Sequence, residues 1–432
     1  MKDKTNNFVE EKLMPLAVKL STIKGLIAIR DGITFAMPLI IIGSLFMIIA
    51  SFPVPGWEEW LGKVNVSGYL WKGVNSSFGL MGLVASFGIA YSFAKQYKIN
   101  AIPAGIVSLS AFITVTPFIA NADKAEGITL NFMGASGIFV AIVLGLINGY
   151  IYQLFINKNI RIKLPDAVPP AVSESFSAII PGAVIITSWL LIASLLQAFE
   201  LPNLHQVIST ILGKPMSLLG STLPGTILVV LFNSFFWFLG IHGGNTVNQI
   251  IMPVWLANLN ENVAAHQAGT ALPNIVNSPF IDNFVYIGGS GATIGLVIAI
   301  ALIARNKKSS KLSKTIAPLT LVPGFFNINE PTMFGLPVVL NFTLVIPFIL
   351  APIANVVISY FAMSIGLVPL AYATAGWTMP PVISGLLVTG SIAGSILQIV
   401  LILVDVALYI PFYRILEKKQ RELELNGESI EE

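Results

Sequence analysis

Cysteine is absent from this chain, and charged and histidine side chains are scarce. Without cysteine the chain itself can form no disulfide, thiolate metal site or cysteine nucleophile. Charged residues make up 10% of the composition, whereas soluble domains carry about 25%. The three histidines show no metal-ligand spacing, and no basic stripe with interleaved aromatic residues is present. Metal chemistry, thiol chemistry and nucleic-acid binding are therefore not expected.

Apolar residues dominate the chain. Hydrophobic residues make up 55% of it and the mean hydropathy is +0.81, which indicates an integral membrane protein. Residues 1–12 are polar, and no short apolar core with a cleavage site follows, so a signal peptide is not expected. From Phe8 to Ile27 apolar residues recur at helical spacing among lysines, which predicts an amphipathic helix on the membrane surface. A solvated helix packing on the protein explains the pattern equally well.

Long apolar segments predict an all-α polytopic membrane protein with about ten transmembrane helices, each about 20 residues long. The weakest of them is Asn245–Leu259, because it is short and contains Pro253. The predicted spans are Ile33–Phe52, Ser76–Ala94, Ala101–Ala120, Gly134–Ile156, Ala178–Phe199, Leu223–Ile241, Asn245–Leu259, Phe284–Ala304, Pro337–Met363 and Thr389–Phe412.

The distribution of lysine and arginine supports this count and orients the chain. Cytoplasmic loops are enriched in these residues. With the N-terminus inside, all but four of the 24 fall on the cytoplasmic side, the exceptions being Lys63, Lys72, Lys124 and Lys214. Omitting the weak span Asn245–Leu259 would move the Arg305–Lys314 cluster outside. Both termini are therefore predicted to be cytoplasmic.

Two apolar stretches, Thr315–Gly335 and Ala371–Leu387, are too rich in proline and glycine to be full spans. Non-helical backbone at membrane depth occurs only where protein or a water-filled cavity surrounds it. Both stretches are therefore predicted to be re-entrant hairpins, one entering from each side. Secondary transporters build their substrate sites from such broken helices near the midplane.

A polar turn, Gly240–Asn245, lies between the sixth and seventh predicted spans. His242 is followed by Gly243 and Gly244, and glycine lets a ligand approach the backbone closely. A neutral imidazole both donates and accepts hydrogen bonds, which suits a hydroxyl-rich ligand. An isolated histidine is more often satisfied by a neighbouring carbonyl. The Gly-Gly-Asn context and the membrane location nevertheless favour a binding role for His242, Gly243 and Asn245.

A second polar segment, Asn327-Ile-Asn329-Glu330-Pro331, lies at the predicted tip of the first hairpin. The Glu330 carboxylate would accept hydrogen bonds from hydroxyls, and the amides of Asn327 and Asn329 would both donate and accept. The alternative is that Glu330 lies at the aqueous mouth and only caps the next helix, since Pro331 suits a first-turn position. Ionisable residues at membrane depth usually mark a substrate path, which favours binding.

Two tryptophans near these segments are candidate stacking faces for a hydroxylated ring. Trp237 precedes the His242 turn, and Trp377 lies in the second hairpin. Tryptophan at a span end is more often an interfacial anchor. For Trp237 the two interpretations are evenly balanced, whereas the hairpin favours ligand contact for Trp377.

Several other features carry no definite role. Asp405, deep in the last predicted span, either pairs with a buried partner or relays protons, and Glu174 is equally open. Arg30 and Asp31 are predicted to form a structural pair at the membrane interface. The segment Gly288–Thr293 superficially resembles a phosphate loop but lacks the following Lys-Ser/Thr and a preceding strand. It is therefore predicted to allow close helix packing.

These segments together resemble a known family. The chain is similar to the membrane-spanning IIC component of the bacterial phosphoenolpyruvate-dependent sugar phosphotransferase system, in its lactose/cellobiose/N,N′-diacetylchitobiose branch. The resemblance covers nearly the whole chain. It rests on Ile29-Arg-Asp-Gly32 with Met37-Pro38, Val168-Pro-Pro-Ala-Val-Ser173, Gly240-Ile-His-Gly-Gly-Asn245, Gly288-Gly-Ser-Gly-Ala292 and Asn327-Ile-Asn-Glu-Pro331.

The resemblance implies a homodimeric permease of the bacterial cytoplasmic membrane with ten spans and two re-entrant hairpins. Glu330 would bind the hydroxyl destined for phosphorylation, and His242 would contact the same sugar ring. Trp237 and Trp377 would stack on the disaccharide. The phosphoryl group would come from phosphoenolpyruvate, through IIA and a phosphocysteine on a separate IIB protein, and no cofactor would be bound. A chain without cysteine fits that division of labour.

The resemblance also organises the chain into parts. The first five spans would mediate dimerisation, and the rest would hold the sugar. The predicted parts are an amphipathic cytoplasmic segment (1–30), an N-terminal helical half with a Pro-rich cytoplasmic link (31–176), the fifth span with the C-terminal transport domain (177–414) and a charged cytoplasmic tail (415–432).

The residues themselves leave alternatives open. An ion-coupled secondary sugar transporter would use Glu330 or Asp405 as proton carrier. An intramembrane enzyme acting on glycans would need a base–nucleophile pair, which the polar segments lack. Which disaccharide is carried, and whether Glu330 is a base or only a binding group, are also left open.

Overall fold

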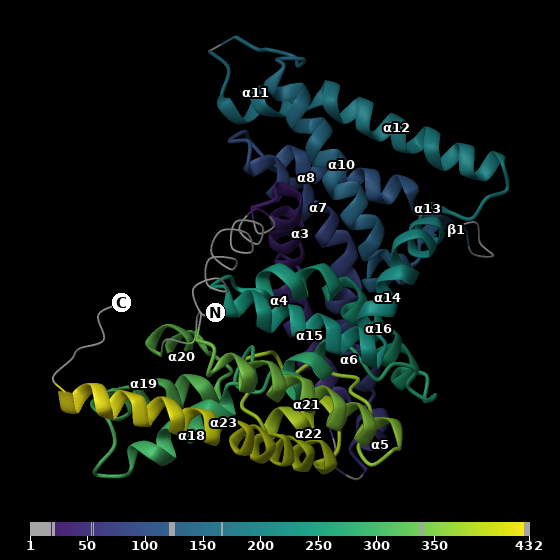
Figure 1. Cartoon of the computed structure of the whole chain (residues 1–432). Helices are drawn as coiled ribbons and strands as arrows, with labels where there is room; N and C mark the ends of the chain where they lie inside the picture. Colours follow the sequence, from purple (N-terminus) through teal and green to yellow (C-terminus); the bar gives the residue numbers. More distant parts are fainter. Residues whose placement is uncertain are drawn as a thin grey trace. The chain divides into compact units, whose positions relative to one another are not determined.

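The computed structural model is mainly helical and forms two compact units (Figure 1). The N-terminal unit comprises Lys19–Ala50 and Glu58–Leu218, and the C-terminal unit comprises Leu219–Glu432 with Ser51–Trp57. Most of the amphipathic helix predicted from Phe8 to Ile27 lies outside the described residues, and so does the end of the charged tail. The described residues are 19, 22–52, 54, 56–120, 126–165, 167–336, 338 and 341–426.

Close approach of helix backbones organises the N-terminal unit. Gly32 and Gly88 face each other, and a Cβ atom on Gly88 would lie 2.4 Å from the carbonyl oxygen of Gly32. Small residues allow two helices in a membrane to pack at short range. The longer helices are α3 (Lys24–Thr34), α4 (Met37–Ala50), α6 (Ser67–Ser77), α7 (Met81–Lys95), α8 (Ile102–Val115), α10 (Ile138–Asn157) and α12 (Ile179–Ala198).

Shorter elements connect these helices. They include an antiparallel pair of strands, in which Phe118 lies opposite Ile128. The all-α prediction did not include this pair. The short elements are α5 (Trp57–Lys63), the 3-10 helix η2 (Phe78–Leu80), β1 (Phe118–Ala120), β2 (Glu126–Ile128), α9 (Leu130–Met133), the 3-10 helix η3 (Ala135–Gly137), α11 (Pro170–Ser177), α13 (Leu204–Ile208), the π-helix η4 (Ser209–Gly213) and α14 (Lys214–Gly220).

A buried polar network joins four helices of the N-terminal unit. The hydroxyl oxygens of Ser86 and Ser108 lie 3.0 Å apart. The amide of Asn148 donates to Ser108 at 3.2 Å, and its oxygen accepts from the Trp189 indole at 2.7 Å. These side chains bond mainly to one another and do not displace the backbone hydrogen bonds of their helices. The helices that carry them therefore stay continuous.

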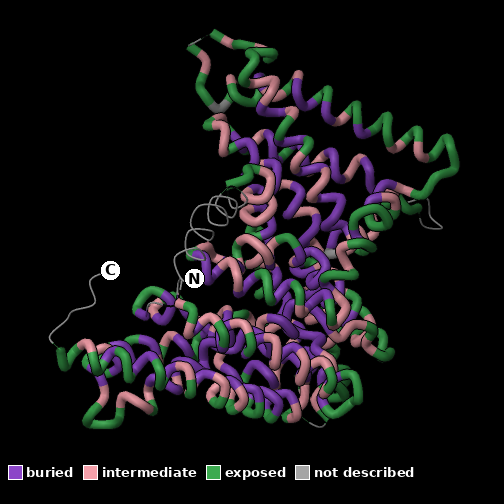
Figure 2. Tube along the Cα trace, in the orientation of Figure 1, coloured by how far each residue is buried: buried purple, intermediate pink, exposed green. Residues whose placement is uncertain are grey.

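Helix α12 is the least covered of the long apolar helices in the N-terminal unit. In the apolar span Val172–Ala198, which contains α12 and most of α11, 22% of an 18-residue apolar window is buried, whereas the share is 67% in Ser67–Lys95 (Figure 2). Most of its apolar surface is therefore exposed, which suits contact with lipid or with a second copy of the chain.

The C-terminal unit packs broken helices around an apolar core. The core includes Leu296 and Ile300 from α18, Phe348 from α21 and Tyr409 from α23. The elements are α15 (Leu223–Phe238), the π-helix η5 (Gly244–Asn248), α16 (Gln249–Gln267), α17 (Ser278–Phe280), the π-helix η6 (Ile281–Val285), α18 (Ile294–Ala304), α19 (Lys311–Phe325), α20 (Glu330–Gly335), α21 (Val345–Ser364), α22 (Ile383–Thr389) and α23 (Ile392–Asn426).

The multi-pass, mainly helical architecture is confirmed. Six helices in the described residues are long and apolar enough to cross a membrane, or seven if Leu204–Gly220 and Leu223–Phe238 form one bent span. The shorter apolar helices α8 and α18 add two further candidates. The count of about ten spans and the two re-entrant hairpins stay predictions, and "second hairpin" is used below only as a name for the segment Ala371–Leu387.

Two predicted spans are wrong at their N-terminal ends. In Phe284–Ala304 the helix begins only at Ile294, because a glycine-rich loop precedes it. In Pro337–Met363 the described helix begins at Val345, and Pro337 itself lies outside the described residues. The Asn341 side chain accepts from the backbone amides of Thr343 and Leu344 just before that helix, as asparagine does at a helix start.

The two proline- and glycine-rich stretches have different local structures. The first is a helix–turn–helix made of α19 and α20, and α19 begins at Lys311, before the predicted start at Thr315. It begins there because the hydroxyl of Ser310 caps the backbone amide of Ser313 at 3.1 Å. The second stretch is non-helical up to Val382 and then forms α22.

Candidate functional site

The centre of the candidate site is a glycine loop, defined here as Gly288–Thr293. It lies between the π-helix η6 and helix α18. Gly288, Gly289 and Gly291 have φ values of +84°, +100° and +84°. Side chains rarely adopt this backbone conformation, which is readily accessible to glycine. The predicted helix over this segment is therefore wrong, because the glycines form the break itself. The close packing predicted for the segment is present: a Cβ atom on Gly291 would lie 2.1 Å from the Phe348 ring of α21.

Asn327 ends helix α19 with its own backbone. Its φ is +58°, and its amide donates to the carbonyl of Gly324 at 3.1 Å, while Ile328 donates to Pro323 at 3.0 Å. This pair of bonds is the Schellman arrangement, in which a left-handed residue follows the helix. Asparagine tolerates that conformation better than most side chains. The polar segment therefore turns sharply away from α19.

The side chains of Asn327 and Asn329 hold three separate segments together. The Asn327 oxygen accepts from the amide of Gly288 at 2.6 Å, and its amide donates to the carbonyl of Trp377 at 2.6 Å. The Asn329 amide donates to the carbonyl of Ser290 at 3.0 Å. Both asparagines are buried. They satisfy backbone groups that no regular helix could satisfy, so the glycine loop, the α19–α20 turn and the second hairpin form one site.

His242 lies beside the same loop. A Cβ atom built on Gly244 would lie 3.1 Å from the His242 ring and 3.9 Å from the hydroxyl of Ser290. His242 Nδ1 accepts from the backbone amide of Asn245 at 3.1 Å. A neutral imidazole that accepts at Nδ1 carries its proton on Nε2, so this bond selects the tautomer that donates from Nε2.

The Trp237 ring packs on His242 with a centroid distance of 4.4 Å. Trp237 is buried, and its indole nitrogen has no hydrogen-bond partner among the described residues. The interfacial-anchor interpretation of Trp237 is wrong, because such an anchor would lie at the surface. Its place beside His242 suits either packing on the imidazole or contact with a bound ring.

Other candidate residues occupy distinct positions. Glu330 is the first residue of α20, is exposed, and forms no hydrogen bond with the described residues. The Trp377 side chain is 47% exposed. Asn245 is exposed beside His242, whereas Gly243 packs on α15, where an added Cβ would lie 2.1 Å from the Asn233 carbonyl oxygen. Gly243 thus serves helix packing directly.

A residue that sequence reasoning missed, Gln398, holds the second hairpin. Its side-chain oxygen accepts from the amides of Val382 at 2.6 Å and Gly385 at 2.9 Å. Its amide donates to the carbonyl of Asn283 at 2.6 Å and to Ser384 at 2.8 Å. All four hydrogen-bonding positions of the glutamine are therefore used. Its only signal in the sequence is a single amide side chain within an otherwise apolar helical stretch.

Val382, which Gln398 holds, has a strained backbone. Its φ is +75° and its ψ is −51°. A β-branched residue in this region is an outlier, and it persists only where surrounding contacts maintain it. The second hairpin is therefore held in one conformation by contacts rather than by local preference.

The structure also places the residues whose role was left open. Asp405 is fully buried and accepts from the Asn355 amide at 3.1 Å, so a buried partner exists. Arg30 and Asp31 form an ion pair at 2.7 Å, as predicted. Glu174 accepts a hydrogen bond from Asn100 in the N-terminal unit.

Comparison with known proteins identifies the family to which this arrangement belongs. The model of the family "Phosphotransferase system, EIIC" matches residues 30–352. The chain is 41% identical to the lichenan permease IIC component of Bacillus subtilis (strain 168), over 99% of this chain and 97% of that protein. It is 42% identical to the cellobiose-specific EIIC component of Geobacillus stearothermophilus, over 97% and 95% respectively.

A solved structure gives the same result. The chain is similar to the crystal structure of ChbC, the IIC component from the N,N′-diacetylchitobiose-specific phosphotransferase system, with a TM-score of 0.90 and 38% identity. The match covers 98% of this chain and 100% of that one.

Proposed function

Because the chain belongs to the EIIC family of the phosphotransferase system, we propose that it carries a β-linked disaccharide and presents it for phosphorylation. It is a sugar permease of that system and a multi-pass membrane protein. The names of its relatives refer to lichenan, cellobiose and N,N′-diacetylchitobiose. A disaccharide of the cellobiose or diacetylchitobiose type is therefore the substrate class that we propose.

One observation carries the proposal: the convergence of His242, Asn327, Asn329 and Trp377 on a single break in the backbone. Polar residues and irregular backbone are costly in a membrane protein and mark the substrate site of transporters. In our proposal His242 Nε2 donates to a ring oxygen or hydroxyl, and Glu330 accepts from the hydroxyl to be phosphorylated. Trp377, which is 47% exposed, supplies an apolar face for a sugar ring, and the buried Trp237 contacts the sugar only where the ring reaches past His242.

The proposed chemistry takes place with a partner. The sugar hydroxyl oxygen attacks the phosphorus of a phosphocysteine on IIB, a phosphorus–oxygen bond forms, and the phosphorus–sulfur bond breaks with the thiolate leaving. Glu330, exposed at the start of α20, accepts the hydroxyl proton or orients the hydroxyl. The chain itself has no cysteine, so the phosphocysteine of this proposal lies on a partner protein.

The ion-coupled alternative is not favoured, because the family to which the chain belongs couples transport to phosphoryl transfer. In our proposal phosphorylation traps the sugar inside the cell, so no ion gradient is needed for accumulation. The transport unit works as a homodimer in the cytoplasmic membrane, with both termini in the cytoplasm.

The test is uptake of labelled cellobiose and N,N′-diacetylchitobiose by cells that express the chain with IIA and IIB. We expect intracellular sugar phosphate that disappears when the phosphoenolpyruvate relay is interrupted. Glu330→Gln should reduce phosphorylation by about 100-fold or more if Glu330 is the base. Glu422→Gln is the matched control, because Glu422 is exposed near the chain end and forms only a surface ion pair.

Two results would contradict the proposal. Unmodified sugar accumulating under a proton gradient would establish ion-coupled transport. Normal phosphorylation by Glu330→Gln, together with normal affinity for the disaccharide, would remove Glu330 from the site.

A further inference from the structure

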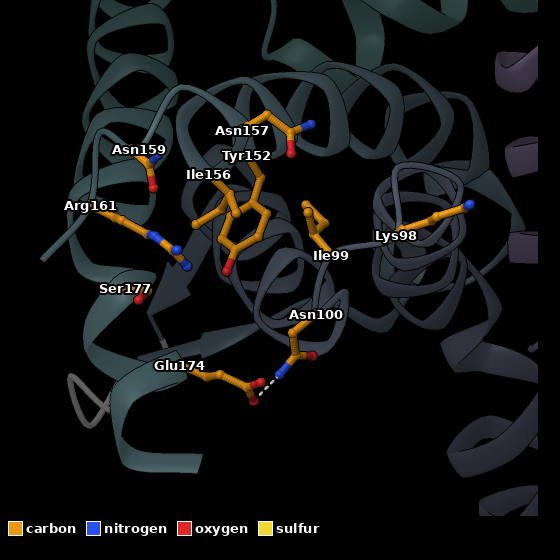
Figure 3. A pocket seen from close by; sticks show the side chains of 10 residues that line it. All are labelled: Lys98, Ile99, Asn100, Tyr152, Ile156, Asn157, Asn159, Arg161, Glu174 and Ser177. Atoms are coloured by element: carbon orange, nitrogen blue, oxygen red, sulfur yellow. Dashed lines mark hydrogen bonds between the residues drawn. The ribbon is translucent and has the colours of Figure 1, made fainter. Parts of the chain in front are cut away.

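Glu417, near the C-terminal end of α23, is a buried carboxylate that the candidate sugar site does not use. It is 7% exposed. Glu174 of the N-terminal unit shows the commoner situation, because it is exposed, lines a cavity of about 340 Å³ and accepts from the Asn100 amide (Figure 3). A buried carboxylate is costly unless hydrogen-bond donors surround it, so the donors around Glu417 indicate what it does.

Three donors surround the Glu417 carboxylate. The backbone amide of Ser310 donates to it at 2.6 Å and the Ser310 hydroxyl at 2.7 Å. The third donor is the Ser313 hydroxyl, and because that hydroxyl uses its hydrogen on Glu417, the Tyr413 hydroxyl 2.6 Å away donates to it. Hydrogen bonds to an ionised acceptor are stronger than neutral ones. Glu417 is therefore bound to the segment that begins α19, 107 positions earlier in the chain.

The first turn of α19 receives most of its caps from α23. A helix begins with four backbone amides that have no acceptor within the helix. Glu417 accepts from the first of them, that of Ser310, and Glu424 accepts from those of Lys311 at 2.7 Å and Leu312 at 3.4 Å. The Ser310 hydroxyl caps the fourth. Glu417 and Glu424, two helical turns apart on one face of α23, also place negative charge at the positive end of the α19 dipole.

Helix α19 depends on this support because its own backbone hydrogen bonds are incomplete. Pro318 and Pro323 lie inside it, and each removes a donor from the helix interior. Its apolar face packs on α23, where Ile316 and Ala317 belong to the same buried cluster as Leu416. Figure 1 shows α19 beside the C-terminal part of α23, drawn in yellow. The carboxylates of α23 therefore hold the start of a helix that is weak by itself.

The other end of α19 leads into the candidate sugar site. Asn327 ends the helix and bonds to the glycine loop and the second hairpin, and Glu330 follows as the first residue of α20. The 15 residues of α19 span about 22 Å, so Glu417 lies far from any sugar that Glu330 touches. Any influence of Glu417 on that sugar must therefore pass through the placement of α19.

We propose that Glu417 is a positioning residue for phosphoryl transfer: it fixes α19 so that Glu330 meets the sugar hydroxyl. This role rests on the proposed function, in which Glu330 accepts from the hydroxyl to be phosphorylated. His242 and the Trp377 ring lie outside α19 and bind the sugar without help from Glu417. Loss of Glu417 should therefore slow phosphoryl transfer and leave the affinity for the disaccharide nearly unchanged, because a displacement of about 1 Å at the reacting group is costly.

The first experiment measures phosphorylation of cellobiose and N,N′-diacetylchitobiose by membranes that contain the full-length chain, with IIA, IIB and phosphoenolpyruvate. Glu417→Ala should lower kcat about tenfold or more, whereas the directly measured dissociation constant of the disaccharide should change less than about threefold. Glu417→Gln keeps an acceptor oxygen for the Ser310 amide and should recover part of the rate. Glu422→Ala is the matched control, because Glu422 is exposed on the same helix, pairs with Lys418 and should change neither quantity.

A double-mutant cycle with Glu330→Gln tests whether Glu417 acts through Glu330. If it does, Glu417→Ala should reduce kcat by less than about twofold in the Glu330→Gln background. Equal reductions in both backgrounds would overturn the proposal. So would an unchanged kcat per disaccharide-binding site in Glu417→Ala, even with a lower midpoint of thermal unfolding, because the carboxylate would then only stabilise the fold.

A third measurement follows the placement of α20 without any transport. The chain has no cysteine, so Phe334→Cys, at a 74% exposed position of α20, gives a single site for a spin label. Glu417→Ala should increase the mobility of the label, and Glu422→Ala should not. Ser313→Ala, which removes one donor to Glu417, should give a smaller increase and serves if Glu417→Ala does not fold.

The label also separates the two proposals from each other. Unchanged mobility in both Glu417→Ala and Ser313→Ala would overturn the positioning role. If the unsubstituted chain forms no sugar phosphate while the label responds as expected, the proposed function fails and the control of α20 by Glu417 stands.

Discussion

The buried amide of the N-terminal network and those of the candidate site act in different ways. In the N-terminal unit Asn148 joins side chains of neighbouring helices, and those helices stay continuous. In the C-terminal unit Asn327 and Asn329 bind backbone groups of the glycine loop, and Gln398 binds the backbone amide of Val382 just before α22. The first arrangement fixes how helices pack. The second permits breaks in a membrane protein, and the polar segments of the candidate sugar site gather at those breaks.

We expect the glycine loop to be the part of the molecule that is most sensitive to substitution. Gly288→Ala should abolish uptake and destabilise the protein by about 4 kcal/mol or more, because the new Cβ would lie 2.2 Å from the Ile294 amide nitrogen at a positive φ. Sugar uptake and the midpoint of thermal unfolding measure the two effects.

The matched control for this substitution is Gly366→Ala. Gly366 has a φ of +79° with nothing within 4 Å of an added Cβ. It therefore carries the conformational cost alone, about 1 kcal/mol. If Gly288→Ala were no worse than Gly366→Ala, close packing of the loop would not hold the break.

Removing the amide that holds the second hairpin should have the next largest effect. Gln398→Leu leaves the amides of Val382 and Gly385 and the carbonyl of Asn283 without their partner. We expect a loss of about 3 kcal/mol, since each unsatisfied buried group costs about 1–3 kcal/mol and the hairpin partly relaxes. Thermal unfolding of the purified variant gives the measurement.

A half-buried glutamine in the other unit calibrates this result. Gln96 donates to the carbonyls of Lys24 and Ser92, and its bond to Lys24 is open to solvent. Gln96→Leu should cost less, about 1 kcal/mol, because water replaces the bond to Lys24. Equal effects of the two substitutions would show that backbone satisfaction at the break is not special.

Asn327 tests whether the backbone turn and the side-chain amide act separately. Asn327→Gly keeps the left-handed turn and removes the amide, whereas Asn327→Ala removes both. We expect losses of stability of about 1 and about 2 kcal/mol respectively, measured by thermal unfolding. Uptake should fall in both, because Gly288 and Trp377 lose their tether. Equal stability of the two variants would mean that the left-handed turn contributes nothing.

The smallest effect on function is expected in the N-terminal network. Asn148→Leu leaves the Trp189 indole without its partner and should cost about 1 kcal/mol. The helices that carry the network stay continuous, so uptake at moderate temperature should be retained. A double-mutant cycle with Trp189→Phe would measure the coupling. Loss of uptake without loss of stability would show that this network also serves transport.

Sequence reasoning located both polar segments but not the contacts that join them. His242, Asn327 and Asn329 were predicted as site residues, and the structure brings them to one loop. The loop itself, Gly288–Thr293, was predicted to lie within a helix. Glycines in an apolar stretch suit both close helix packing and a break, and only the partners at Asn327 and Asn329 distinguish the two.

Gln398 shows a second limit of prediction. A single glutamine on an apolar helix gives no sign of its partners, because those partners are backbone groups of Val382, Gly385 and Asn283. Val382 adopts a backbone conformation that its residue type disfavours. Tertiary contacts overcome the local preference of Val382, so residue type alone predicts the wrong conformation there.

The amino-acid sequence by itself determined the membrane location, the helical class and the chemistry available to the site. These properties follow from hydropathy and side-chain type, which are local. The tertiary structure decided where the helices break and which amides support each break. The deciding bonds join Asn327 to Gly288, 39 positions away, and to Trp377, 50 positions away. Contacts over such separations form only when the whole unit packs, and no local pattern encodes them.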